Sequence, residues 1–162
     1  MDRTIRWFAG LAMVGMLAAC GSGSNSAQAV FQGQQYDLHV QNVDCVAGPA
    51  TGPAISGEGF LDAPLVCTIS YETDAFFSDF VQITVGDVTQ VYQQLRTWQV
   101  FDGSLLRAEM WLRAVPQPIY GGLVYFDEIS NVIGHRVCAE YQIQTGEGEI
   151  DGHFCAKVRA GY

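Results

Sequence analysis

Positively charged residues are scarce in this sequence, which has 8 Lys and Arg against 17 Asp and Glu in 162 residues. Without the charged start at Asp2, Arg3 and Arg6 the counts fall to 6 and 16, a formal charge of −10. Proteins that bind nucleic acid neutralise phosphates with Lys and Arg, so this composition argues against such a partner. It also argues against electrostatic adhesion to anionic lipid, so we expect any membrane contact to come through a covalent anchor.

Long apolar runs are also missing, and the N-terminal run is short. Trp7 to Ala19 is an uncharged, mostly apolar stretch of 13 residues that follows Arg3 and Arg6 and ends in small side chains. A helix that spans a bilayer needs about 20 apolar residues, so this run is too short for a permanent span. The pattern is typical of a signal peptide, and we expect residues 1–19 to be removed.

The cleavage region Leu17-Ala18-Ala19-Cys20 resembles the lipobox of bacterial lipoproteins. This resemblance covers the leader only, and the rest of the chain resembles no family that we recognise. It implies that the Cys20 thiol receives a diacylglyceryl group and that the new amino terminus is acylated, because stable anchoring takes more than one chain. Gly21 after the cysteine implies the outer membrane of the cell envelope. The alternative is an ordinary secretory signal that leaves Cys20 as a spare thiol.

The cysteine count agrees with lipidation. Five cysteines leave one unpaired in an oxidising compartment, whereas assigning Cys20 to lipid leaves an even set for two disulfides. Four cysteines allow three pairings. Proximity favours Cys45 with Cys67 and Cys138 with Cys155.

The remainder divides into a tether and one folded domain. Residues 20–30 begin with a Gly- and Ser-rich stretch that is typical of a flexible spacer. Residues 31–162 are enough for one domain with a hydrophobic core and too few for two ordinary ones.

Helical periodicity is scarce in this domain, and short alternating runs predict strands over 36–43, 65–71 and 80–85. The fold class we expect is mainly β, an antiparallel sandwich or barrel-like domain. Between the first two strands, residues 44–64 are rich in Gly and Pro and predict a long loop, pinned if Cys45 pairs with Cys67. Such a loop is either a stapled surface connection or a binding loop on a rigid base.

The clearest predicted hairpin is C-terminal. A two-residue turn at Gly146-Glu147, with Gly first as in a type II′ turn, sets Cys138 opposite Cys155 and Glu140 opposite His153. The apolar side chains of both strands then share one face, and the polar and cysteine side chains share the other.

A second hairpin is predicted at Asp102-Gly103, with Val91, Leu95 and Phe101 on its core face. Ser104 to Val115 is alternatively a helix, because it consists of good helix formers and Pro116 would end it. In the hairpin interpretation, aromatic and arginine side chains pair across the strands. This predicts a binding surface of Tyr92, Arg96, Trp98, Arg107, Trp111 and Arg113. The alternative is that these side chains only cover one face of the sheet and bind nothing.

No serine-hydrolase elbow, phosphate-binding loop or dinucleotide fingerprint occurs. Glu147, Glu149, Asp151 and Gly152 resemble the start of a calcium loop, but Val158 stands where a bidentate Glu is required. We therefore expect no metal, cofactor or catalytic residue. The expected function is a non-enzymatic binding or assembly role at the envelope, with a protein or glycan partner. The alternative is an enzyme that acts on cell-wall glycan or peptide, because paired carboxylates carry no local motif.

Overall fold

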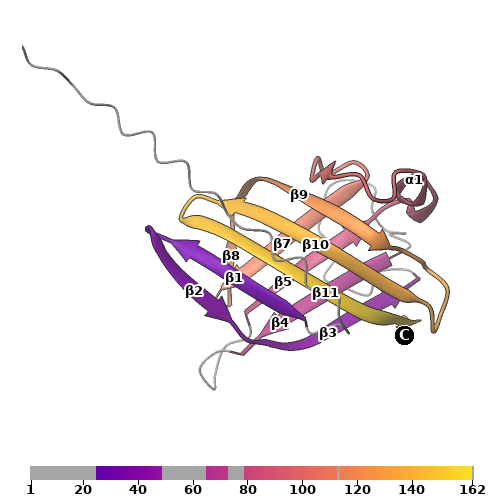
Figure 1. Cartoon of the computed structure of the whole chain (residues 1–162), viewed down its shortest axis with the longest axis horizontal. Helices are drawn as coiled ribbons and strands as arrows, with labels where there is room; N and C mark the ends of the chain where they lie inside the picture. Colours follow the sequence, from indigo (N-terminus) through magenta and orange to yellow (C-terminus); the bar gives the residue numbers. More distant parts are fainter. Residues whose placement is uncertain (1–24, 49–64, 73–78, 113, 162) are drawn as a thin grey trace, which may run out of the picture.

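The computed structural model of the chain describes residues 25–48, 65–72, 79–112 and 114–161. Strands dominate, and they are joined in one hydrogen-bonded sheet that curls into a half-barrel (Figure 1). One short helix is present in the described part, α1 (Val88–Gln93). None of the described helical residues form a segment long and apolar enough to cross a membrane.

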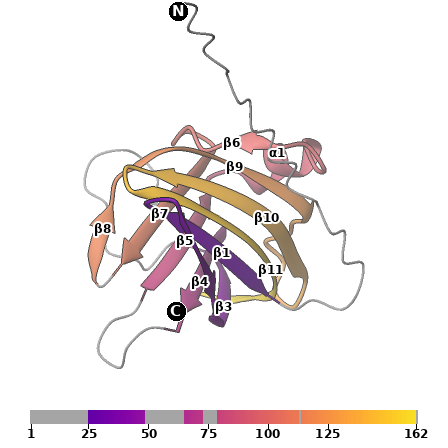
Figure 2. The ribbon, with the colours of Figure 1, turned by 60° about the vertical axis from the view of Figure 1, so that its left-hand side comes forward.

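Two layers face each other across the core (Figure 2). The front layer runs in the order β6 (Gln99–Val100), β9 (Ile119–Glu128), β10 (Arg136–Thr145), β11 (Gly148–Ala160), β1 (Ser26–Phe31) and β2 (Gln34–Leu38). The back layer runs in the order β3 (Val40–Ala47), β4 (Leu65–Tyr71), β5 (Asp79–Val85), β7 (Leu106–Leu112) and β8 (Val115–Gln117).

Strand β11 joins the two layers because it is 13 residues long and changes partner along its length. Its first half pairs with β1, from Gly148 to His153, and its end pairs with β3, from Val158 to Ala160. The second pairing is parallel, so the sheet is mixed, whereas the sequence predicted an antiparallel one. The mainly β class and the sandwich or barrel-like architecture are confirmed.

The core lies between the layers and takes alternate residues of each strand. In β4 and β5 every second side chain is buried, as a strand with one buried face requires. The largest fully buried side chains include Tyr141, Phe126 and Phe154. The hydroxyls of Tyr71 and Tyr141 meet at 2.6 Å and so hydrogen-bond the back layer to the front layer.

The C-terminal hairpin has the predicted register. Cys138 pairs with Cys155, Glu140 with His153 and Ile143 with Ile150. The turn type was wrong, because Gly146 lacks the positive φ that a type II′ turn needs. The Thr145 hydroxyl instead accepts hydrogen bonds from the backbone N–H groups at the tip.

Both predicted disulfides are present, Cys45–Cys67 and Cys138–Cys155. The expected strand at 65–71 is β4 with identical bounds, and 80–85 lies within β5. The expected strand at 36–43 is broken at His39 into β2 and β3. Cys20 and the leader lie outside the described residues.

Two predicted boundaries were wrong. Residues 26–30 of the expected tether form most of β1, because Ala27 and Ala29 are buried against β11. The loop expected from Asp44 begins later, because β3 continues to Ala47 opposite Leu65 of β4. In both cases the local composition favours a loop, but the segment forms a strand because it pairs with a strand that is distant in the sequence. The rest of that loop, 49–64, lies outside the described residues.

Candidate functional site

An exposed tryptophan is brought to the front layer by the segment between α1 and β6. Asp87 caps α1, since its carboxylate accepts hydrogen bonds from the Gln90 backbone and side-chain amides, both at 3.0 Å. After the helix, Arg96 adopts a left-handed φ of 62°, and its N–H donates to the Phe126 carbonyl of β9 at 3.0 Å. This turn fixes the chain onto the edge of β9, so that Trp98, the residue before β6, has a defined position.

Trp98 lies against Tyr125 on the outer side of the front layer. Their ring centroids are 5.4 Å apart with an interplanar angle of 45°. Tyr125 points outward because its neighbours Val124 and Phe126 are buried in the core. Trp98 remains 42% exposed, so a ligand can reach its ring.

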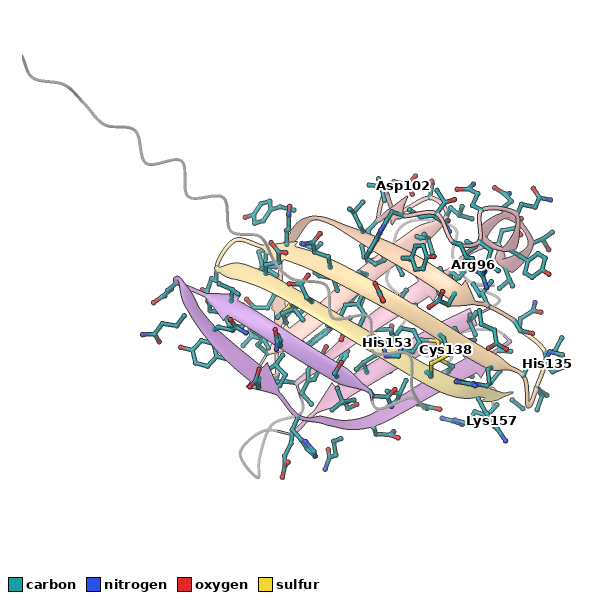
Figure 3. The ribbon with its side chains drawn as sticks, in the orientation of Figure 1. Arg96, Asp102, His135, Cys138, His153 and Lys157 are labelled. Carbon is teal, nitrogen blue, oxygen red and sulfur yellow. A yellow bond between two sulfur atoms is a disulfide. The ribbon has the colours of Figure 1, made fainter. Side chains whose placement is uncertain are left out.

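Polar side chains continue from these rings across the sheet. Glu140 is the cross-strand partner of Tyr125, and His153 is the partner of Glu140. In the adjacent row, Gln142 pairs with Leu123 on one side and with Asp151 on the other. We call this surface the Trp98 face and define it by six residues: Trp98, Tyr125, Glu140, Gln142, Glu149 and Asp151. Figure 3 shows side chains projecting from β9, β10 and β11 toward the viewer.

Two carboxylates on the Trp98 face, those of Glu149 and Asp151, lie close to each other. Glu149 and Asp151 are two residues apart on β11 and therefore project from the same side of the strand. The Gln142 amide donates a hydrogen bond to the Glu149 carboxylate. Partial desolvation raises the pKa of the Asp151 carboxyl, and the charge of Glu149 raises it further. The negative charges of Glu149 and Asp151 therefore repel each other on this face.

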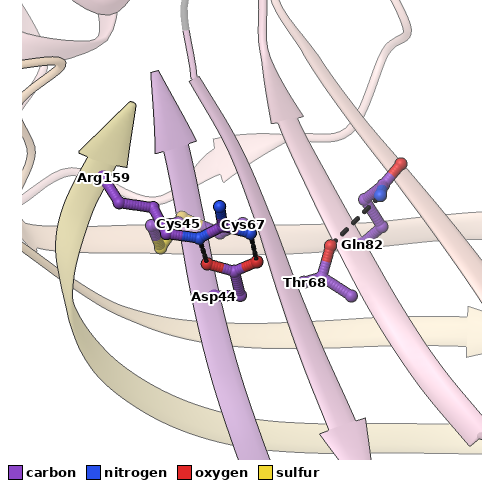
Figure 4. A network of polar contacts seen from close by, with 6 residues as sticks. All are labelled: Asp44, Cys45, Cys67, Thr68, Gln82 and Arg159. Carbon is purple, nitrogen blue, oxygen red and sulfur yellow. Dashed lines mark hydrogen bonds and ion pairs between the residues drawn. A yellow bond between two sulfur atoms is a disulfide. The ribbon is translucent and has the colours of Figure 1, made fainter. Parts of the chain in front are cut away.

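The outer side of the back layer differs, because its polar groups pair with one another. Arg159 forms a two-pronged ion pair with Asp44, and Gln82 donates to the Thr68 hydroxyl at 3.1 Å (Figure 4). Arg107 contacts Glu109 at 3.2 Å. These side chains cover the sheet and satisfy each other's hydrogen-bonding groups.

The predicted hairpin around Asp102-Gly103 was wrong. The turn exists, since Asp102 accepts a hydrogen bond from the Ser104 N–H at 2.8 Å and Gly103 has a φ of 79°. The strands on either side of it pair elsewhere, β6 with β9 and β7 with β5. The turn therefore connects the two layers. The strand interpretation of 104–115 is correct for β7, and the helix lies upstream, where the hairpin had placed its first strand.

The structure consequently divides the predicted binding surface. Tyr92, Arg96 and Trp98 belong to α1 and the segment after it, beside the front layer. Arg107 and Trp111 lie on the back layer, where Trp111 stacks on Phe80 with centroids 5.9 Å apart. Arg113 lies outside the described residues. Of the six, Trp98 is the one with an aromatic partner on the Trp98 face.

Sequence reasoning did not identify Tyr125 or α1 as part of the site. The helix had a usable signal, because Asp87 followed by Gln90 is a capping-box pattern. Tyr125 had none, since its position beside Trp98 depends on the pairing of β6 with β9. Within the described ranges, no group of three or more His, Cys, Asp or Glu side chains is arranged to hold a metal ion.

Comparisons with known proteins add no relative. No family model, no curated protein sequence and no solved structure matches this chain.

Proposed function

We propose that the protein is a lipid-anchored protein of the bacterial cell envelope that binds a glycan on the Trp98 face. The observation that carries the proposal is the Trp98–Tyr125 ring pair, exposed beside a ladder of carboxylate and amide side chains. Function has to be argued from such a site, because a β-sandwich or barrel-like fold serves many unrelated activities.

The chemistry of the face matches a sugar. The apolar C–H faces of a pyranose ring pack on aromatic rings, and Trp98 and Tyr125 offer two of them side by side. Sugar hydroxyls both donate and accept hydrogen bonds. On the Trp98 face, the carboxylates of Glu140 and Asp151 accept hydrogen bonds, and the Gln142 amide can both donate and accept them. A protein interface would instead have an apolar centre that is depleted in charged residues.

The charge of the face selects among glycans. The three carboxylates of Glu140, Glu149 and Asp151 are all on this one face, so an acidic sugar would be repelled. We therefore expect the ligand to be neutral or to carry an amino group. A hydrogen-bond donor of the ligand would also reduce the repulsion between Glu149 and Asp151. Ligand binding is therefore the role that we assign to this carboxylate pair.

The proposed anchor would place this face near the envelope. Asn25 is the fifth residue after Cys20, so the chain between their Cα atoms can span at most about 18 Å. Asn25 is tied to the front layer, because its side-chain oxygen accepts a hydrogen bond from the Cys155 N–H at 2.8 Å. The proposed lipid on Cys20 would hold the Trp98 face within reach of glycans at the membrane surface, and the Gly21 position favours the outer membrane.

The test is binding of the full-length chain, in detergent micelles, to an array of neutral, amino and acidic glycans. Trp98→Ala should weaken binding to the captured glycan by at least about tenfold, or about 1.4 kcal/mol. The melting temperature should stay nearly unchanged because Trp98 is 42% exposed. The matched control is Tyr36→Ala, a ring that is 45% exposed on β2 of the same layer and away from the Trp98 face.

Two results would contradict the proposal. One is retention of full affinity by Trp98→Ala together with Tyr125→Ala. The other is a strong preference for acidic glycans.

A second candidate function is favoured by one observation. Asp151 has a raised pKa beside a second carboxylate, and such pairs act as acid and base in glycoside hydrolysis. Release of soluble fragments from labelled peptidoglycan by the purified protein, and its loss in Asp151→Asn, would establish an envelope enzyme. Binding without release supports the binding protein.

A further inference from the structure

The two disulfides of this protein lie in different surroundings. Cys45 and Cys67 are 0% and 2% exposed and belong to the hydrophobic core. Cys138 and Cys155 lie across β10 and β11 on the outer side of the front layer, where Cys138 is 6% exposed and Cys155 is half-buried (Figure 3). An external thiol can therefore approach the Cys138–Cys155 pair from solvent, whereas Cys45–Cys67 is enclosed.

Each sulfur of the outer disulfide also has a nitrogen atom of a basic side chain beside it. The Arg136 guanidinium donates from Nη2 to Cys138 Sγ at 3.4 Å. On the other strand, His153 Nε2 lies 3.8 Å from Cys155 Sγ. Arg136 and His153 are each two residues from the cysteine that they contact. Side chains two residues apart on a strand lie on the same face of the sheet, so both side chains lie on the face that carries the sulfurs.

Such neighbours favour the reduced form of a disulfide. A positive charge or a hydrogen-bond donor stabilises a thiolate, and a disulfide whose thiolates are stabilised accepts electrons more readily. We propose that Cys138–Cys155 is a thiol–disulfide exchange site that is reduced by a dithiol partner, while Cys45–Cys67 is a structural crosslink. The inference does not rest on glycan binding: Arg136, Cys138 and Cys155 lie outside the Trp98 face, and His153 borders that face as the cross-strand partner of Glu140.

The exchange can be written with its electrons and protons. A thiolate of the dithiol attacks Sγ of Cys155, the more exposed of the two cysteines, and forms a mixed disulfide. The Cys138–Cys155 bond breaks, and its electron pair stays on Cys138 Sγ as a thiolate beside Arg136. The second thiolate of the dithiol then attacks the dithiol's own sulfur in the mixed disulfide, and Cys155 Sγ leaves as a thiolate beside His153 and takes up a proton from solvent. Two electrons pass to the protein, and the dithiol becomes a disulfide.

The first experiment uses the full-length protein in detergent micelles, equilibrated with defined ratios of reduced to oxidised dithiothreitol. After an acid quench and alkylation, mass spectrometry of the peptides gives the reduced fraction of each cysteine pair. Cys138–Cys155 should be half reduced at a ratio at least about tenfold lower than Cys45–Cys67, a difference of about 30 mV. This comparison needs no variant, because the buried pair is the internal control.

The second experiment tests the two contacts. Arg136→Gln combined with His153→Gln should lower the reduction equilibrium constant of Cys138–Cys155 by about tenfold and leave that of Cys45–Cys67 unchanged. Lys157→Gln is the matched control, because Lys157 is the cross-strand partner of Arg136. It should change the constant by less than about twofold, as expected for a screened surface charge.

Three results would overturn the proposal. The two disulfides could be reduced together at one dithiothreitol ratio, which would make both structural. The double variant could leave the equilibrium constant unchanged. Lys157→Gln could have as large an effect as the double variant, which would attribute the shift to the general surface potential and not to the specific contacts.

Discussion

At the scale of single residues, the charged Asp151 carboxylate lowers stability, and the proposed glycan would offset this cost. Its pKa is raised by desolvation and by Glu149, so the folded state disfavours the charged form. Because the folded pKa lies above the unfolded one, this contribution is favourable at low pH and is lost as pH rises through the range just above the ordinary Asp value.

Asp151→Asn should therefore raise the melting temperature at pH 7 and weaken glycan binding. The gain in melting temperature should vanish toward pH 3, where the wild-type carboxyl is protonated as well. Thermal unfolding of both proteins between pH 3 and 8 checks this. A gain that persists unchanged at pH 3 would contradict the electrostatic explanation.

Gly152 is a position where only the absence of a side chain permits the packing. A Cβ there would lie 2.2 Å from the ring of Tyr141, which is 1% exposed in the core. Gly152→Ala should lower the free energy of unfolding by about 1–3 kcal/mol, because the buried ring has to move. Gly121→Ala is the control, since its Cβ would meet the Gln144 side chain at an ordinary 3.5 Å. Urea unfolding measures both variants, and equal small losses would contradict the prediction.

At the scale of elements, β4 and β10 are linked by the buried hydroxyls of Tyr71 and Tyr141. Desolvation raises the pKa of both phenols above the ordinary tyrosine value, and the contact with Tyr141 raises the pKa of Tyr71 further. A phenol whose folded pKa is raised stabilises the protein below the unfolded pKa. This stabilisation is lost as the pH rises above that value, because the unfolded chain then releases its proton first.

We expect the free energy of unfolding to fall above about pH 10, by up to about 1.4 kcal/mol per pH unit for each tyrosine. In Tyr71→Phe with Tyr141→Phe this alkaline fall should be much smaller, whatever the stability of the variant at pH 7. Urea unfolding from pH 8 to 11 measures it. An equally steep fall in the double variant would assign the alkaline loss to other groups.

The C-terminal hairpin was the most predictable element, and the reason is local. Ile143, Ile150 and the two cysteines alternate with polar residues on both strands, so one register puts all apolar side chains on one face. The Asp102-Gly103 segment was not predictable in the same way. Its turn chemistry is correct, but Asp102 and Gly103 cannot specify whether the flanking strands pair with each other or with β9 and β5.

At the scale of the whole molecule, the proposed anchor determines where the domain works. Cys20→Ser should move the protein from the membrane fraction to the soluble fraction and abolish labelling with a fatty-acid probe, because the lipid would have no attachment site. Cell fractionation and the labelling assay measure this. The control is Cys155→Ser with Cys138→Ser, which removes a disulfide and should leave labelling intact. Continued labelling of Cys20→Ser would contradict lipidation.

The sequence by itself determined the features that depend on neighbours along the chain. These are the mainly β class, the bounds of β4, the register of β10 with β11 and the pairing of Cys45 with Cys67. Alternation along a strand and proximity between cysteines are short-range properties, so one segment contains all the information that they need.

Only the tertiary structure decided which distant segments meet. It placed Trp98 beside Tyr125, moved Arg107 and Trp111 to the opposite layer, and used β11 to join the layers through a parallel pairing with β3. It also put Arg136 and His153 against the sulfurs of one disulfide and enclosed the other. Strand partners are selected by how well the whole sheet buries its apolar face, and that free energy belongs to no single segment.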